Sequence, residues 1–109
     1  MKLIRLSWQG FCVPFRKPYI TANTQSTMRY GLLVFLFSDV GLVGVGDASP
    51  TGTGSYEEIE NIAVQLRILG PKFLENGLEN PTIPSLPQGQ QPYTTTQFGI
   101  ETATLDLKA

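Results

Sequence analysis

A run of apolar residues in the first half of the chain most constrains what this chain can fold into. Residues 29–38 read Arg-Tyr-Gly-Leu-Leu-Val-Phe-Leu-Phe-Ser, with apolar side chains at odd and even positions alike. Branched and aromatic residues favour extended backbone, and a strand that is apolar on both faces is typical of the middle of a sheet. This segment is therefore predicted to be a central strand, for which the chain must supply neighbours on both edges.

Two further strands are predicted to flank this segment. Residues 2–9 alternate between apolar and polar side chains, which is the pattern of a half-buried strand. The apolar side chains expected on its buried side are Ile4, Leu6 and Trp8. Residues 38–41 form a turn in which Gly41 is free to take a positive φ, and residues 42–46 return as a hairpin partner. Three consecutive strands with one tight turn predict an antiparallel β-meander.

Two polar segments adjoin these predicted strands. Residues 14–28 contain Pro14 and Pro18, followed by small and polar residues without a helical period. Because proline cannot donate to a strand ladder and pushes its predecessor into extended backbone, we predict a long loop here. Loops of this length inside a compact domain usually serve a function. A second polar loop, rich in glycine, is predicted over residues 46–55.

Two helices are predicted in the second half of the chain. Ser55 and Glu58 have the spacing of a capping box, and the apolar residues that follow recur at intervals of three and four. They predict a helix over residues 55–69 that ends at Gly70-Pro71. Its expected buried residues are Ile59, Ile62, Ala63, Leu66 and Leu69.

A second helix is predicted to begin at residues 94–96, where threonines are candidate caps, and to run to the end of the chain. It is expected to bury Ile100, Ala103 and Leu107 on one face. The predicted fold class is therefore α+β: a three-stranded antiparallel β-meander followed by a small helical bundle.

The composition excludes several classes of function. With 8 basic and 9 acidic side chains, the chain has no basic field that could hold nucleic acid. It has no histidine, which removes Ser-His-Asp and Cys-His catalysis and histidine-containing metal sites. Its one cysteine, Cys12, lies in an apolar stretch and is predicted to be a buried small side chain. The most apolar stretch, residues 32–45, is too short to span a bilayer, so a cytoplasmic protein without a membrane partner is expected.

The sequence shows no nucleophile paired with a base and no metal cage. Arg16, Lys17 and Arg29 are the only clustered cations, and they are either surface charges or the partners of a carboxylate ligand. Gly44 and Gly46 have part of the spacing of a dinucleotide-binding loop, but a serine stands at the third position and the next helix starts too late. The residues alone therefore predict a small α+β module with two polar loops and no catalytic machinery of its own.

Several motifs and their order along the chain resemble a known family. Residues 46–50, Gly-Asp-Ala-Ser-Pro, are similar to that family's Gly-Glu-Ala-x-Pro, and residues 100–107, Ile-Glu-Thr-Ala-Thr-Leu-Asp-Leu, are similar to its Ile-Glu-x-Ala-x-x-Asp-Leu. Together they resemble the N-terminal capping domain of the enolase superfamily, in the muconate-lactonizing-enzyme branch that includes o-succinylbenzoate synthases and dipeptide epimerases. The resemblance covers nearly all of residues 1–109. Asp47 departs from the usual glutamate by one methylene, which puts the hydrogen bond made at that position in question.

The resemblance implies a magnesium-dependent lyase or isomerase as the parent protein. In the family, lysines and three carboxylates on a C-terminal (β/α) barrel carry the chemistry and hold the metal. That barrel is absent from this chain, so neither catalysis nor magnesium binding is expected of residues 1–109 alone. The run Arg-x-Gly-Leu-Leu-Val at residues 29–34 favours an o-succinylbenzoate synthase-like dehydratase, an enzyme of menaquinone biosynthesis. A dipeptide epimerase cap and a stand-alone, non-catalytic module that binds a small ligand are the alternatives.

The resemblance also gives the two polar loops a role. In the family, the corresponding loops close over the barrel mouth, exclude water and contact the variable end of the substrate. The side chains expected to reach a ligand are Arg16, Tyr19, Thr21, Asn23, Thr51 and Thr53. The expected partners are the barrel domain, a small carboxylate substrate and, if the protein is a homo-oligomer, further copies of the chain.

Overall fold

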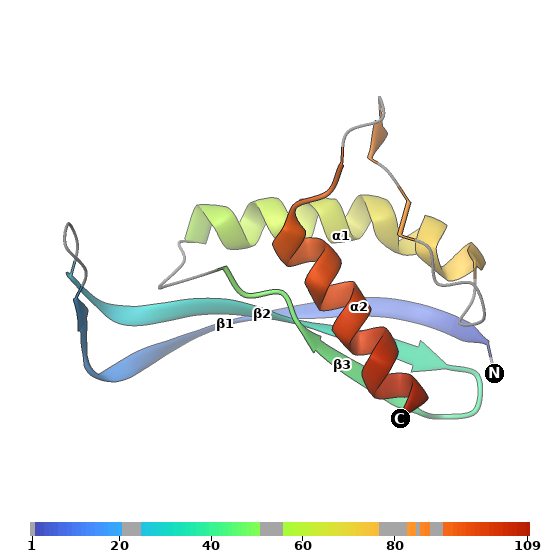
Figure 1. Ribbon diagram of the computed structural model, residues 1–109, viewed down its shortest axis with the longest axis horizontal. Coiled ribbons are helices and arrows are strands. Elements are labelled where there is room, and N and C mark those ends of the chain that lie inside the picture. The colour runs from blue at the N-terminus through green and yellow to red at the C-terminus, as the bar shows by residue number, and fades with distance from the viewer. Residues whose placement is uncertain (1, 21–24, 51–55, 77–82, 85, 88–90) are drawn as a thin grey trace.

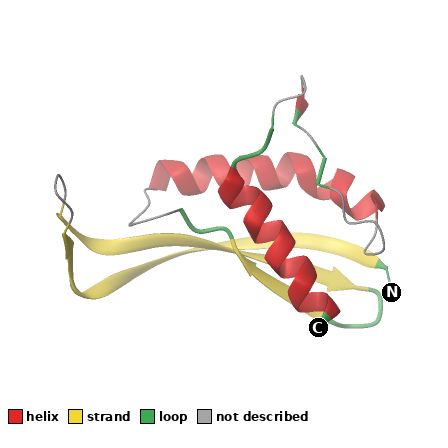
Figure 2. Cartoon of the chain, viewed as in Figure 1, coloured by secondary structure: helices red, strands yellow, loops and turns green. Residues whose placement is uncertain are grey.

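Three strands and two helices make up the chain, with both helices on one face of the sheet (Figure 1). The computed structural model describes residues 2–20, 25–50, 56–76, 83–84, 86–87 and 91–109. The elements in chain order (Figure 2) are β1 (Leu3–Ile20), β2 (Gln25–Ser38), β3 (Val43–Asp47), α1 (Tyr56–Asn76) and α2 (Thr94–Lys108). This order confirms the predicted α+β class, with a β-meander followed by helices.

The central strand is β2, as its apolar sequence predicts. The sheet order is β1-β2-β3, and both pairings are antiparallel. In the turn between β2 and β3, Gly41 has a φ of 85°, a left-handed backbone that glycine adopts without steric cost. The even-numbered residues Leu32, Val34 and Leu36 of β2 are buried, whereas the odd-numbered residues between them are half-buried. The helices therefore cover the even-numbered face, and the other face of the sheet is open.

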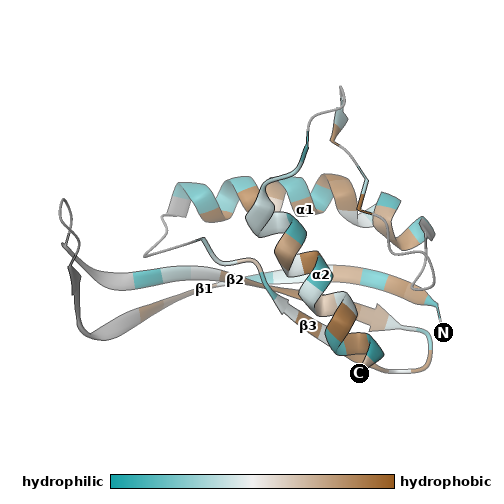
Figure 3. Cartoon of the chain, viewed as in Figure 1, coloured by the Kyte–Doolittle hydropathy of each residue, from teal (hydrophilic) through white to brown (hydrophobic). Residues whose placement is uncertain are grey.

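One apolar core lies between this covered face and the helices. The first helix, α1, packs on β1, and α2 crosses β3; Figure 3 shows apolar residues along both helices and the strands beneath them. The core consists of Leu3, Leu32, Val34, Leu36, Ala48, Ile62, Leu66, Leu69, Phe73, Leu86, Ile100, Ala103 and Leu107. The predicted burial of Ile62 and Leu66 is confirmed. Within the described residues, neither helix has the length and hydropathy that spanning a membrane requires.

A β-bulge near the start of β1 changes which residues face the core. The pairing with β2 shifts by one position between Leu3 and Arg5. As a result Leu3 is buried, with 5% of its surface exposed, and Ile4 is 59% exposed. The expectation that Ile4 lies on the buried side is therefore wrong, because an inserted residue moves the alternation by one position.

The prediction of a loop over residues 14–28 is wrong for both ends of that segment, which belong to strands. The strand β1 continues to Ile20 and β2 begins at Gln25, so only residues 21–24 of that segment lie outside the described residues. Two prolines are compatible with β1 because it is an edge strand, where a missing N–H need not break the ladder. The pairing is irregular between Pro14 and Tyr19, where β1 carries more residues than the facing part of β2.

The first helix is longer than predicted, because it passes through Pro71 and ends at Asn76. An interior proline removes a backbone hydrogen bond and costs about 3 kcal/mol. The turn after it buries Phe73 completely and Leu74 in part, and a fully buried side chain of this kind contributes about 1.5–3 kcal/mol. This burial offsets most of the cost of the proline. The predicted capping residue Ser55 lies outside the described residues.

The start of α2 is held by a side chain from α1. The residue before α2, Tyr93, makes no capping hydrogen bond with its side chain. Instead, the Gln65 Oε1 atom accepts hydrogen bonds from the Tyr93 backbone N–H and the Thr96 hydroxyl, both at 2.9 Å. The predicted threonine cap is therefore replaced by a cap from the neighbouring helix. The predicted buried face of α2 is confirmed.

Candidate functional site

A cleft of about 460 Å³ lies between the β1–β2 hairpin and the beginning of α1. Its lining residues are Gln9, Gly10, Phe11, Cys12, Tyr30 and Ile59. A Cβ added to Gly10 would lie 3.6 Å from the Ile59 Cγ2 atom, so the first turns of α1 lie close above β1. The β1–β2 hairpin extends past the beginning of α1, at the end of the molecule away from the two chain termini (Figure 1).

The free thiol of Cys12 is exposed at this cleft, which makes the prediction of a buried cysteine wrong. Cys12 pairs with Tyr30 of β2, and both residues line this cleft. The apolar residues beside Cys12 in sequence thus do not place it in the core, because it lies at an open cleft beside the first turns of α1.

Two of the predicted ligand-contacting residues, Arg16 and Tyr19, lie on β1 beyond this cleft, and Tyr19 pairs with Ser26 of β2. The positions of their side chains are not among those described, and Thr21, Asn23, Thr51 and Thr53 lie outside the described residues. The segments that lead into both predicted loops lie toward the end of the molecule away from the chain termini (Figure 1). Contact of these six side chains with a ligand stays a prediction.

The segment that follows β3 is fixed to β2 by two hydrogen bonds, and a third lies within the segment itself. Ala48 N donates to Leu32 O at 2.9 Å, and Leu32 N donates to Ser49 Oγ at 3.1 Å. Asp47 Oδ1 accepts a hydrogen bond from Ser49 N at 2.8 Å. The shorter carboxylate at this position therefore bonds to the backbone two residues ahead. These contacts fix the direction in which the chain leaves the sheet toward the second predicted loop.

The second family motif holds α2 against β3. Gly44 and Gly46 lie so close to α2 that a Cβ on either would overlap a carbonyl oxygen of that helix. On the same helix, Asp106 Oδ2 accepts a hydrogen bond from Val45 N at 2.8 Å. The two motifs thus lie in contact, and they connect the last strand of the sheet to the last helix.

Replacing Asp106 with alanine is expected to lower the free energy of unfolding by about 1 kcal/mol, because the Val45 N–H loses its charged acceptor at an exposed site. Asp106→Asn, which keeps an acceptor oxygen, is the matched control and should lose less than half of that. Urea denaturation checks both variants through the midpoint, provided that the slope stays constant. An equal loss for the two variants would show that the hydrogen bond is not the cause.

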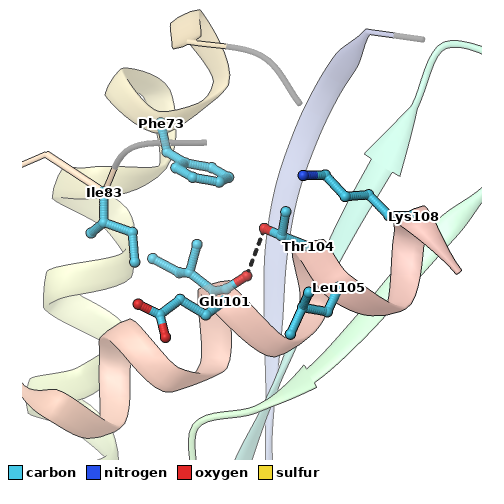
Figure 4. Close-up of a pocket in the computed structure, with 7 residues that line it drawn as sticks. Phe73, Ile83, Glu101, Thr104, Leu105 and Lys108 are labelled. Atoms are coloured by element: carbon cyan, nitrogen blue, oxygen red, sulfur yellow. Dashed lines mark hydrogen bonds between the residues drawn. The ribbon is translucent and has the colours of Figure 1, made fainter. Parts of the chain in front are cut away.

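A second cleft, of about 250 Å³, lies between α1, α2 and Ile83 (Figure 4). Phe73, Ile100 and Leu105 give it an apolar lining, with Glu101 and Lys108 also contributing. The Thr104 hydroxyl donates to the Ile100 carbonyl at 2.8 Å and so is already engaged. Leu105 is 67% exposed. This cleft suits an apolar side chain, and its residues do not form a reaction centre.

The described residues also do not form a metal centre. No three of their His, Cys, Asp or Glu side chains converge on a point where an ion could bind. The described residues therefore do not supply the set of carboxylates that a magnesium site, which the family resemblance implies, would need.

Comparison with known proteins adds a relative of established structure. No protein-family model and no curated protein matches the sequence. The L-Ala-D/L-Glu epimerase from Bacillus subtilis, solved as a substrate-liganded complex, matches 100% of this chain and 28% of its own, with 25% identity and a TM-score of 0.52. The o-succinylbenzoate synthase from Thermosynechococcus elongatus BP-1, complexed with Mg in the active site, matches 62% of this chain and 21% of its own, with 29% identity and a TM-score of 0.49.

The chain thus spans about a quarter of the length of the solved proteins that it matches. Both belong to the muconate-lactonizing-enzyme branch of one superfamily. The β-meander, the contacting motifs and the match along the whole chain lead to one conclusion: the chain is similar in sequence and fold to the N-terminal capping domain of the enolase superfamily, in that branch.

Proposed function

We propose that this chain is the substrate-specificity capping domain of a magnesium-dependent enolase-superfamily enzyme. The observation that carries the proposal is the match to the epimerase, which covers all of this chain but 28% of the epimerase. The remainder of such an enzyme is a (β/α) barrel domain, which is the proposed partner. A bound magnesium there would stabilise the enolate that forms when a proton is removed next to a carboxylate.

The contribution proposed for this chain is to close the site and to select the substrate. The β1–β2 hairpin and the segment after β3 both lead away from the chain termini (Figure 1), and a cleft lies between the hairpin and the beginning of α1. Segments in this position exclude water from a barrel mouth and contact the end of the substrate that does not react. The hydrogen bonds of Asp47 and Ser49 hold the base of the second segment in place.

Two reaction types are proposed for the parent enzyme. Epimerisation of a dipeptide is favoured by the match along the full chain. An o-succinylbenzoate synthase-like dehydration is favoured by the run Arg-x-Gly-Leu-Leu-Val at residues 29–34. A stand-alone module that binds a small ligand without chemistry is the alternative from another class, and the experiment below separates it from a cap.

The test is a chimera in which this chain replaces the matching segment of the Bacillus subtilis epimerase. We expect magnesium-dependent exchange of the substrate α-proton with deuterated solvent, and no exchange by the 109-residue chain alone. A chimera that is folded by circular dichroism but exchanges no proton contradicts the proposal. If the chimera does not fold, the chain is added in trans to an epimerase that lacks its own cap, where restored exchange supports a cap and a lack of exchange supports a stand-alone module.

In an active chimera, Arg16→Ala and Tyr19→Ala are expected to change the ratio of kcat/KM between two substrates by about tenfold, which is about 1.4 kcal/mol of differential transition-state binding. Ser7→Ala, elsewhere on β1, is the matched control and should leave the ratio unchanged. Steady-state kinetics with two substrates, together with a melting curve for each variant, checks the prediction. Equal losses for both substrates with a lower Tm would show that the two residues are structural.

A further inference from the structure

One face of the sheet carries apolar side chains that no described helix covers. Both helices lie on the other face (Figure 1), and the residues of β3 alternate between exposed and buried accordingly. Directly opposite residues of an antiparallel pair point to the same face, so the register identifies which residues share this surface. Its apolar members, which we call the open-face patch, are Leu33, Phe35 and Phe37 of β2 and Val43 and Val45 of β3.

The side chains of the open-face patch are more exposed than those of the core. Val43 and Val45 are 44% and 41% exposed, and the patch residues of β2 are half-buried although β2 is the central strand. On the other face, Val34 and Leu36 are fully buried beneath the helices. Contiguous apolar surface that is exposed on a folded domain and bordered by polar residues is typical of an interaction site.

Two opposite charges lie at diagonal corners of this surface. Arg5 is opposite Phe37, and its guanidinium carbon lies 5.3 Å from the centre of the Phe37 ring. Asp47 is the last residue of β3 and is opposite Leu33. The two charged positions are four residues apart along the strands, about 13 Å, and two strand spacings apart across the sheet, about 10 Å. They are therefore too far apart to form an ion pair within one chain.

This arrangement of charges is self-complementary. The other two corners of the three-stranded region are Val43 and Gln9. When a second copy lies face to face on the first, a two-fold axis along the Val43–Gln9 diagonal exchanges the charged corners. Arg5 of each copy then faces Asp47 of the other, and the strands of the two copies cross at a steep angle, which is one of the ways in which sheets pack. An isologous dimer has this property, because each of its contacts occurs twice.

We propose that the open-face patch is a homodimer interface, in which a second copy of this chain packs on the same residues. The apolar side chains are buried, and two Arg5–Asp47 ion pairs fix the relative orientation of the copies. A three-stranded face is small compared with a standard interface of about 800 Å² per partner, so we expect a reversible dimer with a Kd in the micromolar range. The proposal goes beyond the proposed function and does not depend on it.

The test measures self-association of the 109-residue chain by sedimentation equilibrium at concentrations up to about 1 mM. Arg5→Asp leaves only acidic side chains at the two charged corners, and Asp47→Arg leaves only basic ones. Each variant alone is expected to dimerise with a Kd that is about tenfold higher or more, because like charges face each other. An equimolar mixture of the two should form a dimer with a Kd within about threefold of the unmodified value, because both opposite-charge pairs form again.

Val43→Lys supplies a second test, which stays informative if Asp47→Arg fails to fold without its hydrogen bond to Ser49 N. Val43 meets Val43 of the other copy at the two-fold axis, so lysine there brings two like charges together and should prevent dimerisation. Val64→Lys on α1 is the matched control, since Val64 is 47% exposed and lies outside the patch. It should leave the Kd unchanged. Circular dichroism checks that each variant is folded.

Several results would overturn the proposal. A chain that is monomeric at every concentration would show that something other than a second copy covers the patch, such as the proposed barrel domain. A dimer that Val43→Lys leaves intact, or that Val64→Lys weakens equally, would place the contact on another surface. A mixture of folded charge variants that stays monomeric would refute the pairing of Arg5 with Asp47. Proton exchange by the chimera is a separate measurement, so an inactive chimera would refute the capping function and leave the dimer interface in place.

Discussion

Replacing Gly46 with alanine is expected to lower the free energy of unfolding by about 3 kcal/mol or more, out of the roughly 5–15 kcal/mol that a small domain has. The added Cβ would overlap the Gly99 carbonyl oxygen and lie 2.6 Å from the Ala103 backbone nitrogen. Both are main-chain atoms of α2, so no rotamer change can relieve the overlap and the whole helix must move. Thermal denaturation should show a Tm that is lower by about 10–20 °C.

The matched control for this variant is Gly10→Ala. Gly10 is also a strand glycine, but its added Cβ would meet the Ile59 Cγ2 atom at 3.6 Å, an ordinary van der Waals distance. Its stability should stay the same or rise slightly, because alanine restricts the unfolded chain more than glycine does. Similar losses for the two variants would mean that α2 does not lie against β3 as described.

Truncating Leu66 to alanine is expected to cost about 2–5 kcal/mol. Leu66 is fully buried on the inner face of α1, and the loss combines the transfer of its methyl groups with the cavity that they leave. Val64→Ala on the same helix is the control, since Val64 is 47% exposed and should lose about 0.5 kcal/mol or less. Urea denaturation at constant slope measures both. A loss below about 0.5 kcal/mol for Leu66→Ala would mean that α1 packs with a different face.

Local patterns predict those features of this fold that depend on neighbours in sequence. The apolar run of β2, the turn at Gly41 and the face of α2 that buries Ile100 follow directly from periodicity and turn chemistry. The errors arise where a distant element decides the outcome. Pro14 and Pro18 show in the sequence that a donor is missing, but they do not show that β1 is an edge strand where this loss is tolerated.

The same limit applies to Pro71 and Cys12. The continuation of α1 past Pro71 depends on the burial of Phe73 in a core formed by β2 and α2, which no local pattern contains. Cys12 has apolar neighbours in sequence, yet its thiol is exposed at the cleft between the hairpin and α1.

Some features of the candidate site could be predicted from the sequence, and others could not. The motif residues at 46–50 and 100–107 point to the right family, and the structure explains them as contacts between β3 and α2. The cleft beside the β1–β2 hairpin is different, because it depends on the position of α1 over β1, which no local pattern in the sequence shows.

The two outer edges of the sheet restrict how copies of this domain can associate. On β3, the Val45 N–H is already bonded to Asp106, so an approaching strand finds this donor taken. On β1, Pro14 and Pro18 have no N–H to offer, and the pairing is irregular beside them. Natural sheets use such devices to prevent edge-to-edge growth into larger aggregates. Continuation of the sheet from one copy of this domain into another is therefore disfavoured at these positions of both edges.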